Sequence, residues 1–564
     1  MALRDPSRGG READAEVPTQ PQPGPSLLSL PDIAHYTIAF FLPDSYSGRL
    51  HLSEFSRSML VHYGGTLTRL SIYRGDGNAA RLAALLQRNN KLANVALYHQ
   101  GAFPALCQAI SQGCCRGVER LELVGRKCIM TQERMNLLTG ALEVDGALAK
   151  LVTLDVDHTL SPGSLPNLAT ALAGGAAPLL RRFQFNARNC TEEDMGSIAE
   201  MVEARVRIPA CPGFECVSFK IDNLFTQTTL WTQIRLLRAL LPSVKELPSF
   251  TWHPAFGPCF IEIKPQYLNR IEVGFWNISS ETGTFSWKIL AAAPAIETIA
   301  LTHLFEEGTP HASGAPVMQC MIEALQTGAL QRLKEVELGN WILEDDNLTG
   351  FTNALEEYGC AMQVVDLTFR GCEFGAEGVQ ILADRLRRDA YSALKTLHFA
   401  ASPNIMDLGV VALTDALLEA RQTSLTNLIL YDVGMGNEGI YALASLVSQG
   451  RMDEMEWLDI SKNDAVTQQG IIALARAIDA RGLPLLTYFS MTEIDGMTAV
   501  GISAITHSLI KGCPKLQQID LTGSVLDDDR HCDWVAGMLE SAGRANEVNV
   551  IYDTPDDDDD EDGD

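Results

Sequence analysis

A short apolar pattern that returns about every thirty residues limits what this chain can fold into. In the C-terminal half, an apolar residue is followed three and five positions later by two more. The triplets are Leu333-Val336-Leu338, Met362-Val365-Leu367, Leu394-Leu397-Phe399, Leu425-Leu428-Leu430, Met455-Leu458-Ile460, Leu483-Leu486-Tyr488 and Leu516-Ile519-Leu521. Their last members lie 29, 32, 31, 30, 28 and 33 residues apart, a period typical of repeat architectures. Each triplet predicts one buried face of a short strand, because its last two residues alternate.

A glycine in a helical pattern lies between consecutive triplets. Each glycine precedes an apolar residue by four positions, which is the spacing of one helix face. The pairs are Gly378-Leu382, Gly409-Leu413, Gly439-Leu443, Gly470-Leu474 and Gly501-Ile505. A glycine in the middle of a helix costs about 1 kcal/mol relative to alanine. Five glycines in phase therefore predict that each helix packs closely against its strand.

This strand, loop and helix unit resembles the leucine-rich repeats of the ribonuclease inhibitor family. The most similar segment runs from Trp457 to Asn463 and on through Gly470 to Ala475. The resemblance implies an α/β solenoid, a horseshoe with parallel strands on its concave face and helices on its convex face, which binds another macromolecule without catalysis. The family usually has Asn or Cys just after the strand. Only Asn463 clearly occupies that place, so the other repeats depart from the pattern.

Weaker copies extend the array toward the N-terminus. They are Leu67-Leu70-Ile72, Leu92-Val95-Leu97, Val118-Leu121-Leu123, Leu151-Leu154-Val156, Leu180-Phe183-Phe185, Phe214-Val217-Phe219, Leu268-Ile271-Val273 and Ile296-Ile299-Leu301, with Val244-Leu247 marking one repeat between. We therefore expect a solenoid over 65–552, with about 16–17 repeats and irregular loops near 211–260. Residues 1–26 have few apolar anchors and predict a disordered leader, and 553–564 form an acidic, disordered tail.

The charge of the chain is strongly negative and disfavours nucleic acid as a ligand. The formal net charge is -27, and Asp and Glu residues between Asp553 and Asp564 supply part of it. No run of Lys and Arg with interleaved aromatics reverses the sign locally, so a protein partner is expected instead. The start of the chain lacks a secretory signal, and no segment is apolar enough to span a membrane. Together with thirteen scattered cysteines, expected as free thiols, these features predict a cytoplasmic or nuclear protein.

One short motif suggests catalysis. Asp155, Asp157 and Thr159 match the Asp-x-Asp-x-Thr signature of haloacid-dehalogenase-type phosphatases, in which two carboxylates act over a magnesium ion. That family also needs a lysine and a distal acidic pair in a different α/β sheet, whereas these residues fall within the repeat pattern. We interpret them as concave-face carboxylates. No catalytic residue, cofactor or metal site is expected anywhere in the chain.

The segment 27–64 resembles an F-box, the helical module that docks onto the Skp-type adaptor of cullin ubiquitin ligases. The residues that match the pattern and would bind the adaptor are Leu30, Pro31, Ile38, Leu42 and Leu50. Three departures weaken the match: the usual Glu after Leu-Pro is missing, Phe55-Ser56-Arg57 comes about two residues late, and no Trp follows. The alternative is a helical cap for the first repeat, which a solenoid requires.

Three functions remain open at the level of sequence. An F-box followed by leucine-rich repeats implies a substrate-recruiting adaptor of a ubiquitin ligase, with a Skp-type adaptor and a cullin as partners. Ribonuclease-inhibitor-type repeats followed by an acidic tail also resemble the Ran GTPase-activating proteins, whose partner is a small GTPase. A scaffold with neither activity fits the same residues.

Strand alternation predicts which side chains face the partner. Residues between and beside the buried positions should point into the concavity. They are Asp366, His398, Ile429, Tyr431, Trp457, Asp459, Thr487, Phe489 and Asp520. Among them Tyr431, Trp457 and Phe489 would form an aromatic stripe flanked by carboxylates. Aromatic residues of this kind often carry interface energy.

Overall fold

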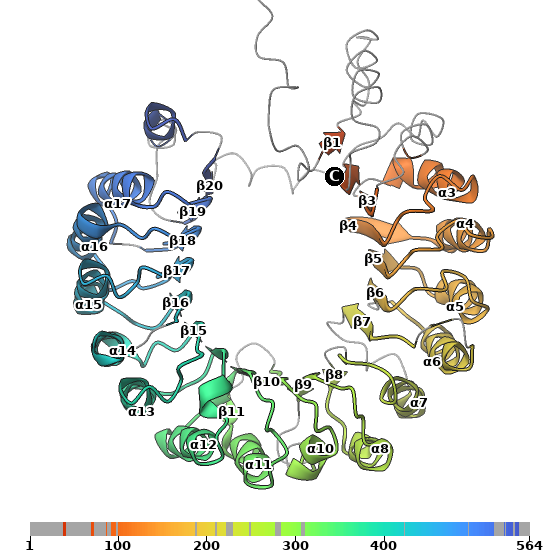
Figure 1. The fold of residues 1–564 in the computed structure, drawn as a ribbon, viewed down its shortest axis with the longest axis horizontal. Coiled ribbons are helices and arrows are strands. Elements are labelled where there is room, and N and C mark those ends of the chain that lie inside the picture. Colours follow the sequence, from red (N-terminus) through yellow and green to blue (C-terminus); the bar gives the residue numbers. More distant parts are fainter. Residues whose placement is uncertain are drawn as a thin grey trace, which may run out of the picture.

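The computed structural model is a curved array of strands and helices that follows the chain around an arc (Figure 1). It describes residues 38–40, 69–72, 86, 92–97 and 100–551, apart from gaps at 187–188, 209–210, 212, 221–228, 248–249, 277–283, 306–310, 422–423, 495, 524–534, 536 and 545–546. Parallel strands line the inside of the arc and helices lie on the outside. The predicted α/β leucine-rich-repeat solenoid is confirmed.

The inner strands form two parallel sheets. The first contains β1 (Ile38–Phe40), β2 (Arg69–Ile72), β3 (Asn94–Leu97), β4 (Arg120–Met130), β5 (Thr153–Leu160), β6 (Arg182–Asn186) and β7 (Cys216–Lys220). The second contains β8 (Phe250–Thr251), β9 (Arg270–Phe275), β10 (Thr298–His303), β12 (Glu335–Gly339), β14 (Asp366–Arg370), β15 (Thr396–Ala400), β16 (Asn427–Tyr431), β17 (Trp457–Asp459), β18 (Tyr488–Ser490), β19 (Gln518–Asp520) and β20 (Asn549–Ile551). A separate small pair is made by β11 (Ala312–Ser313) and β13 (Trp341–Ile342).

Helices connect the strands as right-handed parallel topology requires. In chain order they are α3 (Phe103–Ser111), α4 (Gln132–Leu142), α5 (Leu165–Ala173), α6 (Glu192–Val206), α7 (Leu230–Leu240), α8 (Gly257–Ile263), α10 (Trp287–Ala291), α11 (Ala315–Gln326), α12 (Asp345–Glu357), α13 (Ala376–Arg387), α14 (Met406–Glu419), α15 (Asn437–Ser448), α16 (Gln468–Arg481) and α17 (Ala499–Gly512). Short 3₁₀ turns lie at η3 (Gln100–Ala102), η5 (Pro254–Phe256) and η6 (Ala361–Gln363). Each helix packs on the next along the arc.

Strand pairing reproduces the register expected for the upstream triplets. Leu121 lies opposite Leu154, which lies opposite Phe183, and the same correspondence continues through Val217. The Val244-Leu247 repeat also falls where it was expected, because Glu246 bridges Cys216 on one side and Arg270 on the other. Hydrophobic residues from these triplets and the helices form one continuous buried cluster between the two layers.

Two triplets of the C-terminal half were assigned to the wrong residues. The Met362 triplet is instead Val364-Leu367-Phe369, since Val336 pairs with Leu367 and Leu338 with Phe369. The Leu483 triplet is instead Leu486-Phe489-Met491, since Leu458 pairs with Phe489 and Met491 hydrogen-bonds to the next strand. With these corrections, the last members of the triplets, Leu338, Phe369, Phe399, Leu430, Ile460, Met491 and Leu521, lie 30 or 31 residues apart throughout.

The two sheets meet at an interruption. Between β7 and β9 the inner backbone is connected through Glu246, which makes single bridges to Cys216 and Arg270. The same rung also pairs with β9 through β8, so only its step to β7 lacks a strand ladder. Lys245 N–H donates to Glu215 O at 2.7 Å, and Asn269 N–H donates to Lys245 O at 2.7 Å. The interruption falls within 211–260, the region expected to be irregular from its Pro and aromatic content.

The phased glycines lie in the first turn of their helices and face the preceding helix, which differs from the expected mid-helix contact with the strand. A Cβ built on Gly470 in α16 would meet Asn437 Oδ1 of α15 at 2.5 Å. Asn437 Oδ1 accepts hydrogen bonds from the N–H groups of Thr467 (3.0 Å) and Gly470 (3.2 Å). Asp407 of α14 does the same for Gly436 at 2.8 Å. A side chain at the start of one helix thus caps the next helix.

The buried polar residue after each strand is more varied than the family pattern. Asn463 is fully buried; its Oδ1 accepts from Val433 and Met435 N–H, and its Nδ2 donates to Leu430 O at 2.8 Å. Cys372 and Trp341 occupy the equivalent positions and donate to carbonyls of the preceding turns, Leu338 O at 3.3 Å and Leu301 O at 2.8 Å. Asn463 is therefore not alone in this role. Cys372 was overlooked because the triplet before it was misplaced by two residues.

Little of the N-terminal segment is described. Ile38–Phe40 is strand β1, which pairs in parallel with β2, whereas a helical segment was expected at these three residues. The other residues expected to bind an adaptor, Leu30, Pro31, Leu42 and Leu50, lie outside the described residues, as do the leader and the acidic tail.

Candidate functional site

The concave face of the C-terminal repeats carries the candidate binding site. Alternate residues of β14 to β19 point into the arc, while the residues between them are buried against the helices. Neighbouring strands are in register, so the inward positions form rows that cross the sheet. One row contains Asn427, Trp457, Tyr488 and Gln518, and the next contains Ile429, Asp459, Ser490 and Asp520.

Trp457 and Tyr488 form a stacked aromatic pair on this face. Their ring centroids lie 3.9 Å apart with an interplanar angle of 29°. They occupy paired positions on β17 and β18, which brings the two rings together without any distortion of the sheet. Trp457 remains 41% exposed. We call Trp457, Tyr488, Asp459 and Asp520 the aromatic–acidic patch.

Phe489 does not belong to the concave face, which corrects the predicted aromatic stripe. Its side chain is fully buried in the core. Both possible triplets in this segment satisfy the same apolar spacing, but they differ by three residues. An odd shift turns a strand over, so Tyr488 replaces Phe489 on the concave face and the predicted position of Thr487 changes with it. The regular period of 30 or 31 residues is the sequence signal that distinguishes the two registers.

Tyr431 and Ile429 occupy the concave side of β16, as expected, and both are partly buried. Tyr431 does not contact the Trp457 stack in the interactions that the structure describes; instead Lys462 Nζ lies 5.5 Å from its ring centroid. The same ammonium pairs with Glu493 at 3.1 Å. The chain thus already holds one cation between an aromatic ring and a carboxylate at the edge of the patch.

Asp366 and His398 also lie on the concave side, and burial shifts the pKa of both side chains. The misplaced Met362 triplet left Asp366 on the correct face, because a shift of two residues preserves alternation. Burial raises the pKa of Asp366, whose Oδ1 accepts a hydrogen bond from Thr368 Oγ1 at 2.7 Å. Burial, with a smaller contribution from Arg370, lowers the pKa of His398 to about 4. His398 is therefore neutral at pH 7.

Asp459 and Asp520 border the aromatic pair. Burial raises the pKa of Asp459, hydrogen bonds from Ser461 oppose the shift, and the charge of Asp520 adds to it. Ser461 N–H donates to Asp459 Oδ1 at 2.9 Å. Asp520 accepts from Thr522 Oγ1 at 2.7 Å and, at 3.4 Å, from the Tyr488 hydroxyl. The two carboxylates are thus fixed beside the rings by short-range hydrogen bonds.

The Asp-x-Asp-x-Thr segment lies on β5 in the first sheet. Asp155 pairs across the sheet with Glu122 and Gln184, between the buried Leu154 and Val156. It is therefore a concave-face residue of the repeat array, as interpreted. Within the described part of the chain, no group of three or more His, Cys, Asp or Glu side chains is arranged to hold a metal ion.

No protein-family model matches the chain. No curated protein matches it either. Among solved structures, a crystal structure of the yeast Rad7 and Elc1 complex aligns with 15% sequence identity and a TM-score of 0.41, covering 69% of this chain and 87% of that chain. An internalin (inlF) from Listeria monocytogenes aligns with 13% identity and a TM-score of 0.31, covering 78% of this chain and 94% of that chain.

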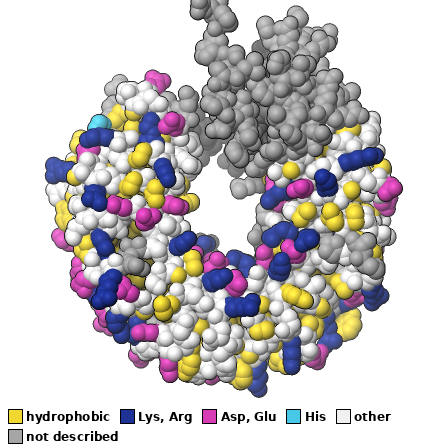
Figure 2. Space-filling view, in the orientation of Figure 1, with side chains coloured by type: hydrophobic (Ala, Val, Ile, Leu, Met, Phe, Trp, Pro, Cys, Tyr) yellow, Lys and Arg dark blue, Asp and Glu magenta, His cyan; other side chains and the backbone are white. Residues whose placement is uncertain are grey.

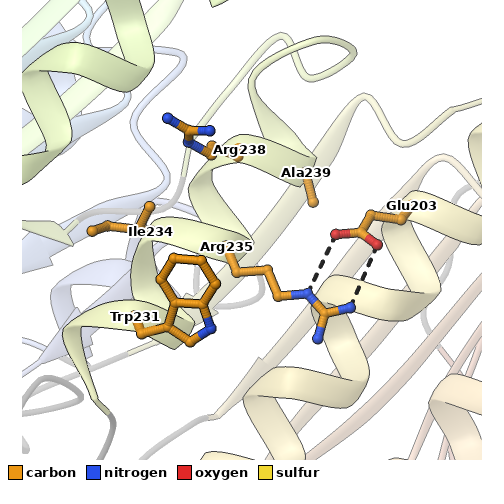
Figure 3. A pocket seen from close by; sticks show the side chains of 6 residues that line it. All are labelled: Glu203, Trp231, Ile234, Arg235, Arg238 and Ala239. Atoms are coloured by element: carbon orange, nitrogen blue, oxygen red, sulfur yellow. Dashed lines mark hydrogen bonds and ion pairs between the residues drawn. The ribbon is translucent and has the colours of Figure 1, made fainter.

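A second exposed aromatic residue lies on the convex surface (Figure 3). Trp231 of α7 is 73% exposed and lines a depression of about 270 Å³ together with Ile234, Arg235 and Glu203. Arg235 pairs with Glu203 at 3.4 Å, so its charge is already neutralised within the chain. The depression is shallow, and it lies between neighbouring helices on the side away from the strands.

The described cysteines are free thiols, and burial makes most of them unreactive. Burial raises the pKa of Cys107, Cys320 and Cys372 to about 12, so these side chains stay protonated and act as small apolar residues. Among the residues described, no helix combines the length and the apolar character needed to cross a membrane.

Proposed function

We propose that the chain binds a protein partner on its concave face and that the aromatic–acidic patch is the centre of the contact. The observation that carries this proposal is Trp457, a large aromatic side chain left 41% exposed and stacked on Tyr488 on the concave side of β17 and β18. Trp and Tyr are enriched among residues that dominate binding energy, because they bury large surfaces at a small entropic cost. A curved strand face of this length presents them to an extended surface.

The more specific role that we propose is recruitment of a substrate to a ubiquitin ligase. It rests on the F-box-like residues Leu30, Pro31, Leu42 and Leu50 and on their position ahead of the repeats, and no longer on Ile38, which lies in strand β1. In this arrangement the N-terminal segment would bind a Skp-type adaptor, and through it a cullin, while the concave face would hold the substrate. The two surfaces would then be separable by mutation.

The first test addresses the concave face. Trp457→Ala and Tyr488→Ala should each weaken binding to a partner recovered by affinity purification by about thirtyfold, since a desolvated interface aromatic contributes about 2 kcal/mol. The midpoint of thermal unfolding should change much less, because Trp457 is only partly covered in the free chain. Trp231→Ala, which removes an exposed tryptophan from the convex side, is the matched control. Equal affinity of Trp457→Ala and the unchanged chain would contradict the proposal.

The second test addresses the ligase role. Affinity purification of the full chain followed by mass spectrometry should recover a Skp-type adaptor and a cullin. Leu42→Ala combined with Leu50→Ala should lose both while retaining the concave partner, and Trp457→Ala should show the opposite pattern. Recovery of a small GTPase would instead favour the GTPase-activating reading. If neither the ligase subunits nor a small GTPase is recovered, the result would favour a scaffold without either activity.

A further inference from the structure

Charges on the concave face are mostly neutralised within the chain itself. Arg182 pairs with Glu246 at 3.1 Å, Arg270 with Glu335 at 3.5 Å, and Arg370 with Glu337 at 3.5 Å. Arg120 pairs with Glu122, and Arg270 also pairs with Glu272. Figure 2 shows dark blue and magenta side chains next to one another around the lower rim of the central hollow. This part of the face therefore offers little net charge to a partner.

The patch near the C-terminal end of the array differs. Among the described residues, no Lys or Arg pairs with Asp459 or Asp520, and the inward positions of β16 to β19 carry neither residue type. Lys462, which follows β17 at the edge of the patch, is already held by Glu493 and Tyr431. The two carboxylates repel one another, and partial burial removes part of their hydration. A cation supplied from outside would relieve both costs.

The geometry beside these carboxylates suits a flat cation. Trp457 presents exposed indole surface two residues from Asp459 on the same strand face, and the Tyr488 hydroxyl reaches Asp520 at 3.4 Å. A guanidinium group is planar, stacks on aromatic faces and makes two parallel hydrogen bonds to a carboxylate. An ammonium group can approach a ring but cannot do both in one plane.

We propose that the aromatic–acidic patch binds an arginine side chain of the partner protein, stacked on the uncovered indole face of Trp457 and paired with Asp459, while the charge of Asp520 two strands away adds to the attraction. This inference rests on the proposed function and adds the chemistry of the partner to it. The partner surface is basic and presents at least one arginine able to reach the inner sheet. The net charge of -27 on the chain attracts such a surface over longer distances.

A small-molecule titration tests the ligand chemistry directly. The full chain is labelled with 5-fluorotryptophan, and the Trp457 resonance is assigned as the one lost in Trp457→Phe. Acetyl-argininamide should shift this resonance, acetyl-citrullinamide, which has the same shape without the charge, should not, and acetyl-lysinamide should bind about tenfold more weakly than the arginine probe. The Trp231 resonance is the internal control for non-specific binding to an acidic protein. An equal response to arginine and citrulline would overturn the proposal.

Substitution of the carboxylates separates this proposal from the proposed function. Asp459→Asn should reduce partner affinity about tenfold, and Asp520→Asn, which removes only a nearby charge, should reduce it by a smaller factor. Both variants should show a weaker salt dependence of binding, and this readout in Asp520→Asn suffices if the Asp459 variant folds poorly. Glu272→Gln, which removes a carboxylate already paired with Arg270, is the matched control. Full affinity of both Asp variants, with loss in Trp457→Ala, would overturn the arginine proposal and leave the binding face intact. Full affinity of Trp457→Ala would overturn the proposed function itself.

Discussion

Titration of His398 makes the free energy of unfolding of the chain depend on pH. Its pKa is lowered to about 4 in the folded protein, against about 6.5 in an unfolded chain. Between these values the unfolded chain binds a proton that the folded chain does not. Stability is therefore complete above about pH 6.5, falls as the pH drops toward 4, and loses at most about 3 kcal/mol from this residue.

The prediction is tested with His398→Asn, which removes the titrating group. Urea unfolding at pH 7.5 and pH 5.0 should show a smaller loss of free energy of unfolding in the variant than in the unchanged chain. His507→Asn, on the exposed side of α17, is the control for the exchange of a histidine for asparagine. An identical pH dependence in all three proteins would show that His398 protonates freely in the folded state.

The sequence predicted the orientation of most concave-face side chains, but not of all of them. Asp366, His398, Ile429, Tyr431, Trp457, Asp459 and Asp520 occupy the side that alternation assigns to them. Phe489 does not, because Leu483, Leu486, Phe489 and Met491 are all apolar and all buried, so local spacing fits two registers. The distribution of ion pairs could not be predicted, since Arg270 and Glu335 are brought together only by the register of three separate strands.

At the scale of the element, the phased glycines predict a contact between helices. Gly470→Ala places a Cβ 2.5 Å from Asn437 Oδ1, the atom that caps the start of α16. We expect a loss of about 1–3 kcal/mol in the free energy of unfolding, in spite of the better helix propensity of alanine. Gly196→Ala in α6 is the control, because a Cβ there meets nothing within 4 Å. That variant should be stabilised by up to about 1 kcal/mol, and a similar gain in Gly470→Ala would contradict the packing assignment.

The sequence pattern of a helix does not show which neighbouring element its glycines contact. The four-residue spacing correctly placed each glycine on the buried side of a helix, but it could not distinguish the strand beneath from the helix beside it. The deciding atom, Asn437 Oδ1, belongs to the neighbouring repeat. Contacts of this kind depend on the distance between repeats, which follows from the whole stack.

At the scale of the whole molecule, the interruption at Glu246 predicts two units that unfold separately. All seven tryptophans lie at or after Trp231. Trp231 itself is on α7 and packs beside α6 at the junction, so the fluorescence reports mainly on the second sheet and its helices. Leu154→Ala, a fully buried position of β5, should lower the stability of the first sheet by about 2–5 kcal/mol. In urea, the loss of far-ultraviolet circular dichroism should then begin before the fluorescence change.

The reciprocal variant completes this test. Leu458→Ala, buried in β17, should move the fluorescence transition itself to lower urea concentration. Superimposable transitions from both probes in both variants would mean that the array unfolds as one cooperative unit in spite of the interruption.

The interruption at Glu246 also affects how the molecule can bend. Neighbouring rungs within each sheet are connected by ladders of strand pairs, whereas the step from the Glu246 rung to β7 is a single bridge to Cys216. Bending is therefore easiest at this rung, and the repeats before and after it act as two lever arms. A small rotation there becomes a larger displacement at the far ends of the two arms. The Trp457 stack lies well along the second arm, so bending at this rung would change its distance from the repeats of the first sheet.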